Sequence, residues 1–305
     1  MEDCLVAIII LNWNGYSYTR NCLHSLKRAT SKDFKIILVD NASSDGSLNQ
    51  LKEEFEEVIY LQNEENLGFT GGNNVGIQYA LDRGFEYIML LNNDTEVKED
   101  FMEPLTNALN TNDSLGAVQP LMYYLHDKTT VWNAGGKYCS WTGGSKSIKQ
   151  FKNVSVPYAT DWITGCCVLV RTSVVRQVGP LNQHYFAYFE DVDWSLRIQK
   201  AGFDLAVIPH SIIYHEAGAS LKSKSKGKEG RISPKVHYLA TRNQLFQLRK
   251  HVNLPKSIIA WAYQLGKFTL FAVYFLVRNR KKKLAATYSG LVDGLTLKLT
   301  QPHEK

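Results

Sequence analysis

LVAIIILNWNG, residues 5–15, begins with an unbroken apolar run and then changes abruptly to polar residues and glycine. Three further short apolar runs follow, at 35–40 (KIILVD), 58–61 (VIYL) and 87–91 (YIMLL). The segments between the runs have the length of helices: 16–29, 47–57 and 72–83. Short β-branched strands that alternate with helices are typical of a parallel sheet buried on both faces. The first third of the chain therefore predicts an α/β fold.

Each predicted strand is followed by a polar or glycine-rich segment. Ligands of open parallel sheets bind beyond the carboxyl ends of the strands, which all meet at one edge. We therefore expect these segments to line a single cleft. They are Asn12–Gly15, Asp40–Gly46, Asn66–Gly76 and Asn92–Thr95.

The rest of the chain is organised differently. Gly-Gly turns and scattered strand-like runs after residue 114 predict an α+β half that completes the cleft. Residues 220–236 are polar and basic, which predicts a mobile loop, and a helical pattern returns at 237. The predicted organisation is a catalytic domain over 1–236, made of a nucleotide-binding half 1–114, a second half 115–219 and the loop 220–236, followed by a helical segment over 237–305.

The placement of charge excludes one class of partner. The net charge of the chain is +6, but residues 217–236 and 278–305 each carry +5, so the remainder sums to −4. An overall basic surface for nucleic acid does not fit this separation, and we expect no nucleic-acid partner.

The cysteines and the first residues indicate a compartment. The five cysteines form no CxxC pair, so we expect core cysteines in a reducing environment. They are Cys4, Cys22, Cys139, Cys166 and Cys167. The start of the chain lacks a basic segment, and its apolar run is too short for a signal peptide or a membrane span. We therefore expect a cytoplasmic protein.

Asn92-Asn93-Asp94 places a carboxylate at the end of a fully apolar strand. A nucleoside diphosphate binds through a divalent cation, and carboxylate oxygens are ligands that suit Mg²⁺ or Mn²⁺. Asp94 is therefore a candidate metal ligand. The alternative is a turn or a helix cap, positions that Asn and Asp also favour.

Glu190, Asp191 and Asp193 put three carboxylates within four residues, among aromatic side chains. At a helix start the dipole would hold Asp191 ionised while apolar neighbours limit its solvation, which suits a general base toward a hydroxyl group. The alternative is an acidic capping cluster in which Asp193 pairs with Arg197, four residues along the helix.

His215 follows an apolar stretch, and its imidazole at an element end would complete a metal site. The alternative is a structural or merely exposed histidine. Three tryptophans, Trp132, Trp141 and Trp162, are candidate platforms for sugar rings, although buried tryptophan is equally common.

Taken together, these motifs resemble the family-2 inverting glycosyltransferases of the GT-A fold, a Rossmann-like, mostly parallel sheet flanked by helices. The resemblance is strongest to the rhamnosyltransferase-like branch of bacterial surface polysaccharide synthesis. It covers about residues 5–250, in the correct order. It implies that Asp40 reads the nucleotide base, that Asp94 holds Mn²⁺ or Mg²⁺ and the donor diphosphate, and that His215 matches the family's late histidine.

The resemblance also implies the remaining site residues. The acidic pair is Glu190-Asp191, with Asp191 as the base, and Trp162 and Gly165 are assigned to the acceptor side. Residues 68–76 (GFTGGNNVG) line the donor pocket. The expected nucleotide-sugar-binding residues are Asn12, Asn14, Asp40, Asn41, Gly68, Gly72, Asn73, Asn92, Asn93 and Asp94. The chain departs from the family at the metal motif, which often has two carboxylates, whereas Asn occupies its first two positions here.

The last part of the chain predicts a membrane contact. Residues 257–277 are apolar and aromatic but contain Gln264 and Lys267, which leaves 268–277 as a run too short to cross a bilayer. A basic cluster at 278–283 follows at once, and this combination favours an interfacial helix on anionic lipid. We expect peripheral membrane binding through 257–283, at the inner face of the cell membrane. The alternatives are a core helix or a homodimer formed through the C-terminal helices.

The sequence therefore predicts an inverting, divalent-metal-dependent glycosyltransferase with a C-terminal helical appendage. Its expected donor is dTDP-rhamnose or a UDP-sugar, and its expected acceptor is a hydroxyl of a polysaccharide or a lipid-linked glycan. Two other functions stay open. A nucleotidyltransferase would need a phosphate-binding loop near the first strand, where the chain has no Lys or Arg, and a non-catalytic sugar-nucleotide-binding module would not need Asp94 and Asp191.

Overall fold

The computed structural model describes residues 5–150, 155–217 and 232–299. The chain divides into two compact units. The first comprises residues 1–137, 147–183 and 190–217, and the second residues 138–146, 184–189 and 218–305. The predicted domain division at 236 stays a prediction.

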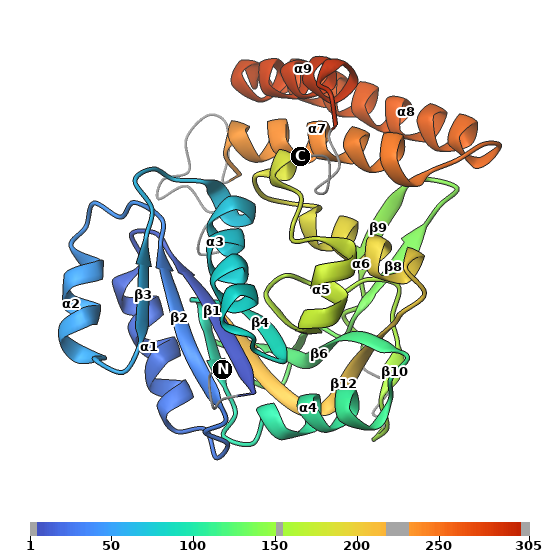
Figure 1. The fold of residues 1–305 in the computed structure, drawn as a ribbon. Coiled ribbons are helices and arrows are strands. Elements are labelled where there is room, and N and C mark those ends of the chain that lie inside the picture. Colours follow the sequence, from blue (N-terminus) through green and yellow to red (C-terminus); the bar gives the residue numbers. More distant parts are fainter. Residues whose placement is uncertain (1–4, 151–154, 218–231, 300–305) are drawn as a thin grey trace. The chain divides into compact units, whose positions relative to one another are not determined.

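The first unit is built on a ten-stranded sheet (Figure 1). Its parallel part has the order β4-β1-β2-β3, with β1 at Val6–Asn12, β2 at Phe34–Asp40, β3 at Ile59–Gln62 and β4 at Tyr87–Asn92. These are the four strands that the apolar runs predict. The side chains of β1 and β4, and of β2 from Ile36 onward, are mostly buried on both faces because helices cover both sides of the sheet, whereas the edge strand β3 is only partly buried.

The mixed part of the sheet continues from β4 in the order β11-β6-β12-β10. Strand β11 pairs antiparallel with both β4 and β6, whereas β12 pairs parallel with β6. The bounds are Leu115–Tyr124 for β6, Tyr158–Ala159 for β10, Cys167–Arg171 for β11 and Asp204–His215 for β12, with β5 (Thr95–Val97) on β12 and β7 (Val131–Asn133) on β6. Strand β12 is long and continues past an irregularity between Ile208 and Ile212.

Two apolar cores lie on the two faces of this sheet, because successive side chains of a strand point to opposite sides. On β1, Ile8 and Ile10 belong to one core, and Ala7 and Ile9 to the other. The first core packs against α1 (Tyr16–Lys27), α2 (Ser47–Glu54) and α4 (Met102–Thr111). The second packs against α3 (Gly68–Arg83), α5 (Thr172–Val178) and α6 (Glu190–Lys200).

Helix α3 begins at Gly68, four residues before the predicted start at 72, so the glycine-rich segment is helical rather than a loop. Its glycines allow a close approach to the sheet. A Cβ on Gly72 would lie 2.4 Å from Leu11 Cδ1, and one on Gly76 would lie 2.5 Å from Ile9 Cγ2. The glycine pattern therefore reflects helix packing as well as any role in a pocket.

The described part of the second unit contains the α-helices α7 (Pro234–His251), α8 (Lys256–Val277) and α9 (Lys281–Thr296). Its small core joins Leu245 and Leu248 of α7 to Ala260 and Phe268 of α8. The tip of a hairpin formed by β8 (Gly136–Cys139) and β9 (Gly144–Ser147) also belongs to this unit. The helical pattern starts at Pro234, slightly earlier than predicted, and most of the predicted loop 220–236 lies outside the described residues.

The cysteine prediction is wrong at one position. Cys22, Cys166 and Cys167 are buried free thiols, as expected of core cysteines, but Cys139 is exposed. It lies in the hairpin of the second unit, where no large core can form around it. Cys4 lies outside the described residues.

Candidate active site

A chain of hydrogen bonds joins the carboxyl ends of three parallel strands. Asn93 Nδ2, just beyond β4, donates to Thr19 Oγ1 (2.9 Å), which donates to Asn12 Oδ1 (2.7 Å), at the end of β1. Asn12 Nδ2 in turn donates to Asp40 Oδ1 (2.8 Å), at the end of β2. The register of β1, β2 and β4 brings together residues that are far apart in sequence, as the strand pattern predicts.

Asp40 is fully buried beneath this edge. Its second oxygen, Oδ2, accepts a hydrogen bond from the backbone N–H of Ser43 (2.9 Å), so both carboxylate oxygens are engaged by the chain. Asn12 also donates to Ser43 Oγ (3.1 Å) and Ser47 Oγ (2.9 Å). In this conformation Asp40 shapes the loop that follows β2, and its contact with a nucleotide base stays a prediction.

Asn41 has a comparable role at the next position. Its Nδ2 donates to Asn66 Oδ1 (3.0 Å), and its Oδ1 accepts from Asn63 Nδ2 (3.0 Å) and the Leu67 backbone N–H (3.0 Å). Asn41 thereby fixes the backbone of the segment that precedes α3. Asn73, within α3, donates to the carbonyl of Phe69 (2.8 Å).

Asp94 and His215 meet at the same edge. The two predicted metal ligands are 121 residues apart in numbering, yet His215 Nε2 lies 3.0 Å from Asp94 Oδ1, because β5 pairs with the end of β12. The ring of Trp132 packs edge-on against the imidazole, with ring centroids 4.1 Å apart. Both side chains are largely buried, and His215 Nδ1 has no hydrogen-bond partner among the described residues.

This donor set fits a divalent cation that also binds a diphosphate. Among the described residues no group of three or more His, Cys, Asp or Glu side chains gathers to hold a metal. One carboxylate and one imidazole would leave most coordination positions to diphosphate oxygens and water, an arrangement found where cations bind together with phosphorylated substrates. Carboxylate suits both Mg²⁺ and Mn²⁺, whereas imidazole is a ligand of transition metals, so the pair fits Mn²⁺ better.

Asp191 lies in the first turn of α6, where three acidic side chains face the positive end of the helix dipole. Its Oδ2 accepts from the backbone N–H of Gly165 (3.1 Å) and its Oδ1 from that of Val192 (2.8 Å). Burial raises the pKa of Asp191 above its usual range, and these backbone donors partly oppose the increase. Part of the residue stays accessible, as a base toward an external hydroxyl requires.

Glu190 and Asp193 are placed differently. Glu190 is buried, its Oε2 has no partner among the described residues, and burial, reinforced by the charge of Asp191, raises its pKa well above 4.5. Asp193 Oδ2 forms a buried ion pair with Arg197 Nε (2.8 Å), which confirms the capping-cluster interpretation for this carboxylate. The three acidic residues therefore divide into one that is partly exposed, Asp191, and two that are buried.

We predict that Glu190→Gln changes the pH dependence of stability. The folded pKa of Glu190 exceeds that of the unfolded chain, so the folded state binds more protons above pH 4.5, and stability falls as pH rises through this window. Glutamine removes this dependence. The melting temperature of the variant relative to wild type should therefore rise by on the order of 2–4 °C from pH 4.5 to 7.5, measured by differential scanning fluorimetry. A difference that stays constant with pH would contradict the assignment.

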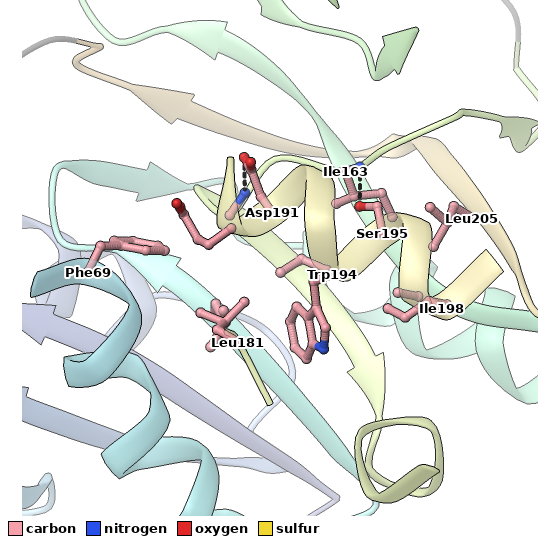
Figure 2. Close-up of a pocket in the computed structure, with 13 residues that line it drawn as sticks. Phe69, Ile163, Leu181, Asp191, Trp194, Ser195, Ile198 and Leu205 are labelled. Atoms are coloured by element: carbon pink, nitrogen blue, oxygen red, sulfur yellow. Dashed lines mark hydrogen bonds between the residues drawn. The ribbon is translucent and has the colours of Figure 1, made fainter. Parts of the chain in front are cut away.

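A small pocket lies beside Asp191 (Figure 2). Its cavity volume is about 10 Å³, room for about one water molecule. Most of its lining is apolar, and Figure 2 shows Phe69 of α3 across from Asp191 and Trp194 of α6. The pocket is too small for a nucleotide sugar, so it is a recess beside the base and not the expected donor-sized cavity. Asp94 and Asp40 do not line it.

Asp94 and Asp191 are nevertheless connected through one short segment. The backbone N–H of Asn92 donates to the carbonyl of Cys166 (2.8 Å), and the neighbouring Gly165 donates to Asp191. Burial raises the pKa of the Cys166 thiol, and the charges of both Asp94 and Asp191 raise it further, as expected if both carboxylates lie close to it. The two predicted acidic positions are therefore linked through residues 165 and 166, which directly precede β11.

The acceptor-side residues have clear structural roles. A Cβ on Gly165 would lie 3.2 Å from the ring of Phe69, so glycine allows the backbone to approach this ring. Trp162 is buried, and its Nε1 donates to the carbonyl of Lys137 (3.3 Å). Trp141 is exposed, in the second unit. Acceptor binding by Gly165 and Trp162 stays a prediction.

Trp13 is a candidate that the sequence motifs do not single out. It follows β1 directly and is 57% exposed, next to Asn12 and to Asn14, whose φ is 50°. Asn14 Oδ1 accepts from the Ser44 backbone N–H (2.8 Å), so this predicted donor residue links the loops after β1 and β2. A large exposed aromatic beside such a polar edge is the signal that identifies Trp13, and it depends on exposure that the sequence does not report.

Comparison with known proteins agrees with this geometry. Residues 7–179 match the family Glycosyl transferase family 2. The N-acetylglucosaminyl-diphospho-decaprenol L-rhamnosyltransferase of Mycobacterium tuberculosis is 24% identical, over 96% of this chain and 99% of that protein. The dTDP-rhamnosyl transferase RfbF of Shigella flexneri is 25% identical, over 94% of this chain and 95% of that protein.

A solved structure supports the fold independently. The mannosyltransferase PcManGT of Pyrobaculum calidifontis, in complex with GDP-Man and Mn²⁺, superposes with a TM-score of 0.58 and 12% identity, covering 97% of this chain and 88% of that one. The mostly parallel sheet flanked by helices is thus the GT-A fold that the motifs predict. The chain belongs to glycosyl transferase family 2 and is a glycosyltransferase with rhamnosyltransferases among its relatives.

Proposed function

We propose that this glycosyltransferase moves a sugar from dTDP-rhamnose or a UDP-sugar to a hydroxyl of a polysaccharide or lipid-linked glycan, with inversion at the anomeric carbon. The main support for this proposal is the position of Asp191. The residue is partly exposed, two backbone N–H groups hold its carboxylate, and residues 165 and 166 link it to the strand end beside the Asp94–His215 pair. The rhamnosyltransferase relatives favour dTDP-rhamnose as the donor and a lipid diphosphate-linked sugar as the acceptor.

The chemistry follows from these positions. Asp191 accepts the proton of the acceptor hydroxyl as its oxygen forms a bond to the anomeric carbon. The bond from that carbon to the donor diphosphate breaks on the opposite side, and its electron pair leaves with the nucleoside diphosphate. Asp94 and His215 would hold a divalent cation, Mn²⁺ or Mg²⁺. The positive charge of this cation would neutralise negative charge on the diphosphate. A nucleotidyltransferase is not favoured, because the loop after β1 carries no basic residue for a triphosphate.

A screen of nucleotide sugars tests this function. The protein should be stabilised in thermal unfolding by dTDP-rhamnose or a UDP-sugar in the presence of Mn²⁺, since a ligand of the native state raises the melting temperature. Transfer to a synthetic lipid-diphosphate-linked GlcNAc should then give a product of inverted anomeric configuration by NMR. Retention of configuration, or binding without either transfer or donor hydrolysis, would reject the inverting enzyme, and the latter would favour the binding module.

Trp13 supports the donor side of the proposal. An exposed indole at the sheet edge provides a face on which a nucleotide base stacks, and such stacking contributes about 1–3 kcal/mol. Trp13→Ala should raise the KM for the donor by about tenfold and leave kcat within about twofold. Trp141→Ala removes an exposed tryptophan of the second unit and serves as the control, with no change in donor KM expected. Equal effects of the two variants would remove Trp13 from the donor site.

We further propose that α8 docks the enzyme on the membrane surface, at the cytoplasmic face. The helix has 22 residues, so the prediction that it is too short to span a bilayer is wrong on length and composition. One stripe, Ala260, Gln264 and Phe268, is buried, and Gln264 Nε2 donates to the carbonyl of Thr142 (2.7 Å) within the same unit. Because α8 packs on its own protein along one side, we expect it to lie at the membrane–water interface and not to cross the bilayer.

Apolar side chains elsewhere on α8 are exposed: Ile258, Ile259, Tyr263, Leu265, Leu270, Phe271, Val273, Tyr274, Leu276 and Val277. Basic residues continue directly into α9 at 278–283. We predict that the protein co-sediments with vesicles containing anionic lipid at low salt, and that Leu270→Glu/Phe271→Glu reduces the bound fraction at least fivefold. Unchanged binding in this variant would reject docking through α8. A dimer in light scattering that the same substitutions dissociate would assign the face to self-association.

A further inference from the structure

The backbone just before the proposed base has an unusual conformation. Residues 184–189 lead directly into Glu190, the first residue of α6. Three of them have positive φ: Phe186 (61°), Tyr188 (71°) and Phe189 (70°). Aromatic residues rarely adopt this left-handed conformation, because their Cβ clashes with the backbone. Such strained residues persist only where the surrounding structure holds them, and they concentrate at active sites.

A buried asparagine of α7 holds this segment. Asn243 is 0% exposed, and its Nδ2 lies within hydrogen-bonding distance of the carbonyls of Tyr185 (3.0 Å), Ala187 (2.8 Å) and Tyr188 (2.8 Å). An amide has two N–H bonds, so at least one of them is shared between two carbonyls. One side chain thereby satisfies three backbone acceptors of a segment that leaves the short 3-10 helix η1 (Gln183–Tyr185) and then has no regular secondary structure up to α6.

Two neighbours on α7 complete the arrangement. Gln247 Nε2 donates to the carbonyl of Phe189 (2.9 Å), the last residue before α6. Arg242 Nε donates to Asn243 Oδ1 (3.0 Å), which directs the amide nitrogen of Asn243 toward the segment. The guanidinium also donates to the carbonyl of His184 (2.8 Å), at the start of the segment. Side chains of α7 thus hold 184–189 from its first residue to its last.

We propose that Asn243 and Gln247 are positioning residues for Asp191. By fixing 184–189 in its left-handed course, they determine where α6 begins. The link runs through the chain itself: Asp191 is two residues beyond Phe189, and its carboxylate accepts from Val192 and Gly165 when the first turn of α6 is in place. The inference rests on the proposed function, because Asp191 matters to the rate only as a base.

The helix offers a matched control for Gln247. Gln244 is also buried and also donates its amide to a single carbonyl, that of Gly143 (2.6 Å), but not to the 184–189 segment. Gln247→Ala and Gln244→Ala therefore remove the same group from the same helix. Both should lower the melting temperature. Gln247→Ala alone should lower kcat, by ten- to a hundredfold, because small displacements of a reacting group have effects of this size. The KM for the donor should stay within about twofold in both.

Hydrogen exchange measures the position of the segment without any assay of transfer. In Gln247→Ala, and more strongly in Asn243→Ala, amides of residues 185–192 should exchange at least tenfold faster than in wild type, whereas Gln244→Ala should leave them unchanged. Each variant is compared at a temperature where its unfolding transition shows it to be folded. If Asn243→Ala does not fold, the hydrogen exchange of Gln247→Ala alone tests the proposal.

The outcomes separate this inference from the proposed function. Unchanged exchange of 185–192 in Gln247→Ala, or an equal loss of kcat in Gln247→Ala and Gln244→Ala, overturns the positioning role. If the wild-type protein transfers no sugar from any donor in the screen, the proposed function fails, and exchange still decides whether the α7 amides hold the segment.

Discussion

Asp191→Asn is expected to lower the kcat of sugar transfer by about a thousandfold while leaving the KM for the nucleotide sugar within about twofold of wild type. The substitution keeps the shape of the side chain and removes its ability to take a proton. In the proposed site the donor binds at the edge that includes Asp94 and not through Asp191, so its binding should persist. In wild type the rate should fall as pH drops through the pKa of Asp191, which burial raises above 3.8, because the base must be ionised.

Asp193→Asn is the matched control for this prediction. Asp193 lies on the same helix, but its carboxylate is bound to Arg197, which also donates to the carbonyls of Val178, Gly179 and Pro180. Its replacement should lower the melting temperature and leave kcat within a few-fold of wild type. If Asp191→Asn keeps more than a tenth of the activity, another group takes the proton and the assignment of the base is wrong.

Asp94→Asn is expected to abolish the stimulation of transfer by Mn²⁺ and to lower kcat/KM by about a hundredfold or more, since charge on the leaving diphosphate is then no longer offset. Asparagine keeps one oxygen as a weak ligand but loses the negative charge that binds a cation. Binding provides a second readout: Mn²⁺ should enhance the thermal stabilisation by dTDP or UDP in wild type, and this enhancement should vanish in the variant.

Glu96→Gln controls for the loss of one charge in the same region. Glu96 follows Asp94 by two residues and lies 3.5 Å from Lys128, away from the proposed cation site. Its neutralisation should leave the response to Mn²⁺ unchanged. His215→Ala should weaken the response without removing it, because a carboxylate would still bind the cation. A normal response to Mn²⁺ in Asp94→Asn would exclude Asp94 as a metal ligand.

The α/β character and the location of the site follow from local patterns. Each apolar run near the start of the chain forms a parallel strand, because a run without polar interruption is stable only where both faces of a strand are covered. The side chains that follow such strands then gather at one edge whatever the details of the loops. This is why Asn12, Asp40 and Asn93 could be grouped from the sequence, and why they are found in one hydrogen-bonded chain.

Other features depend on partners that no local pattern identifies. Residues 68–71 lie outside the helix that the sequence predicts at 72–83, yet they begin α3, whose glycines permit contact with β1. Three carboxylates in four residues look alike in sequence. Only the neighbours brought by folding distinguish them: Arg197 for Asp193, burial for Glu190, and the Gly165 backbone for Asp191.

The sequence by itself determined the fold class, the edge at which the site forms and the identity of its acidic residues, because strand period, strand order and residue type are properties of short segments. The tertiary structure alone decided which carboxylate is accessible, that Asp94 meets His215, and that α7 holds the segment before Asp191. These contacts join residues separated by 56 to 121 positions, and their energies depend on burial and on distances that exist only once the sheet and helices have packed.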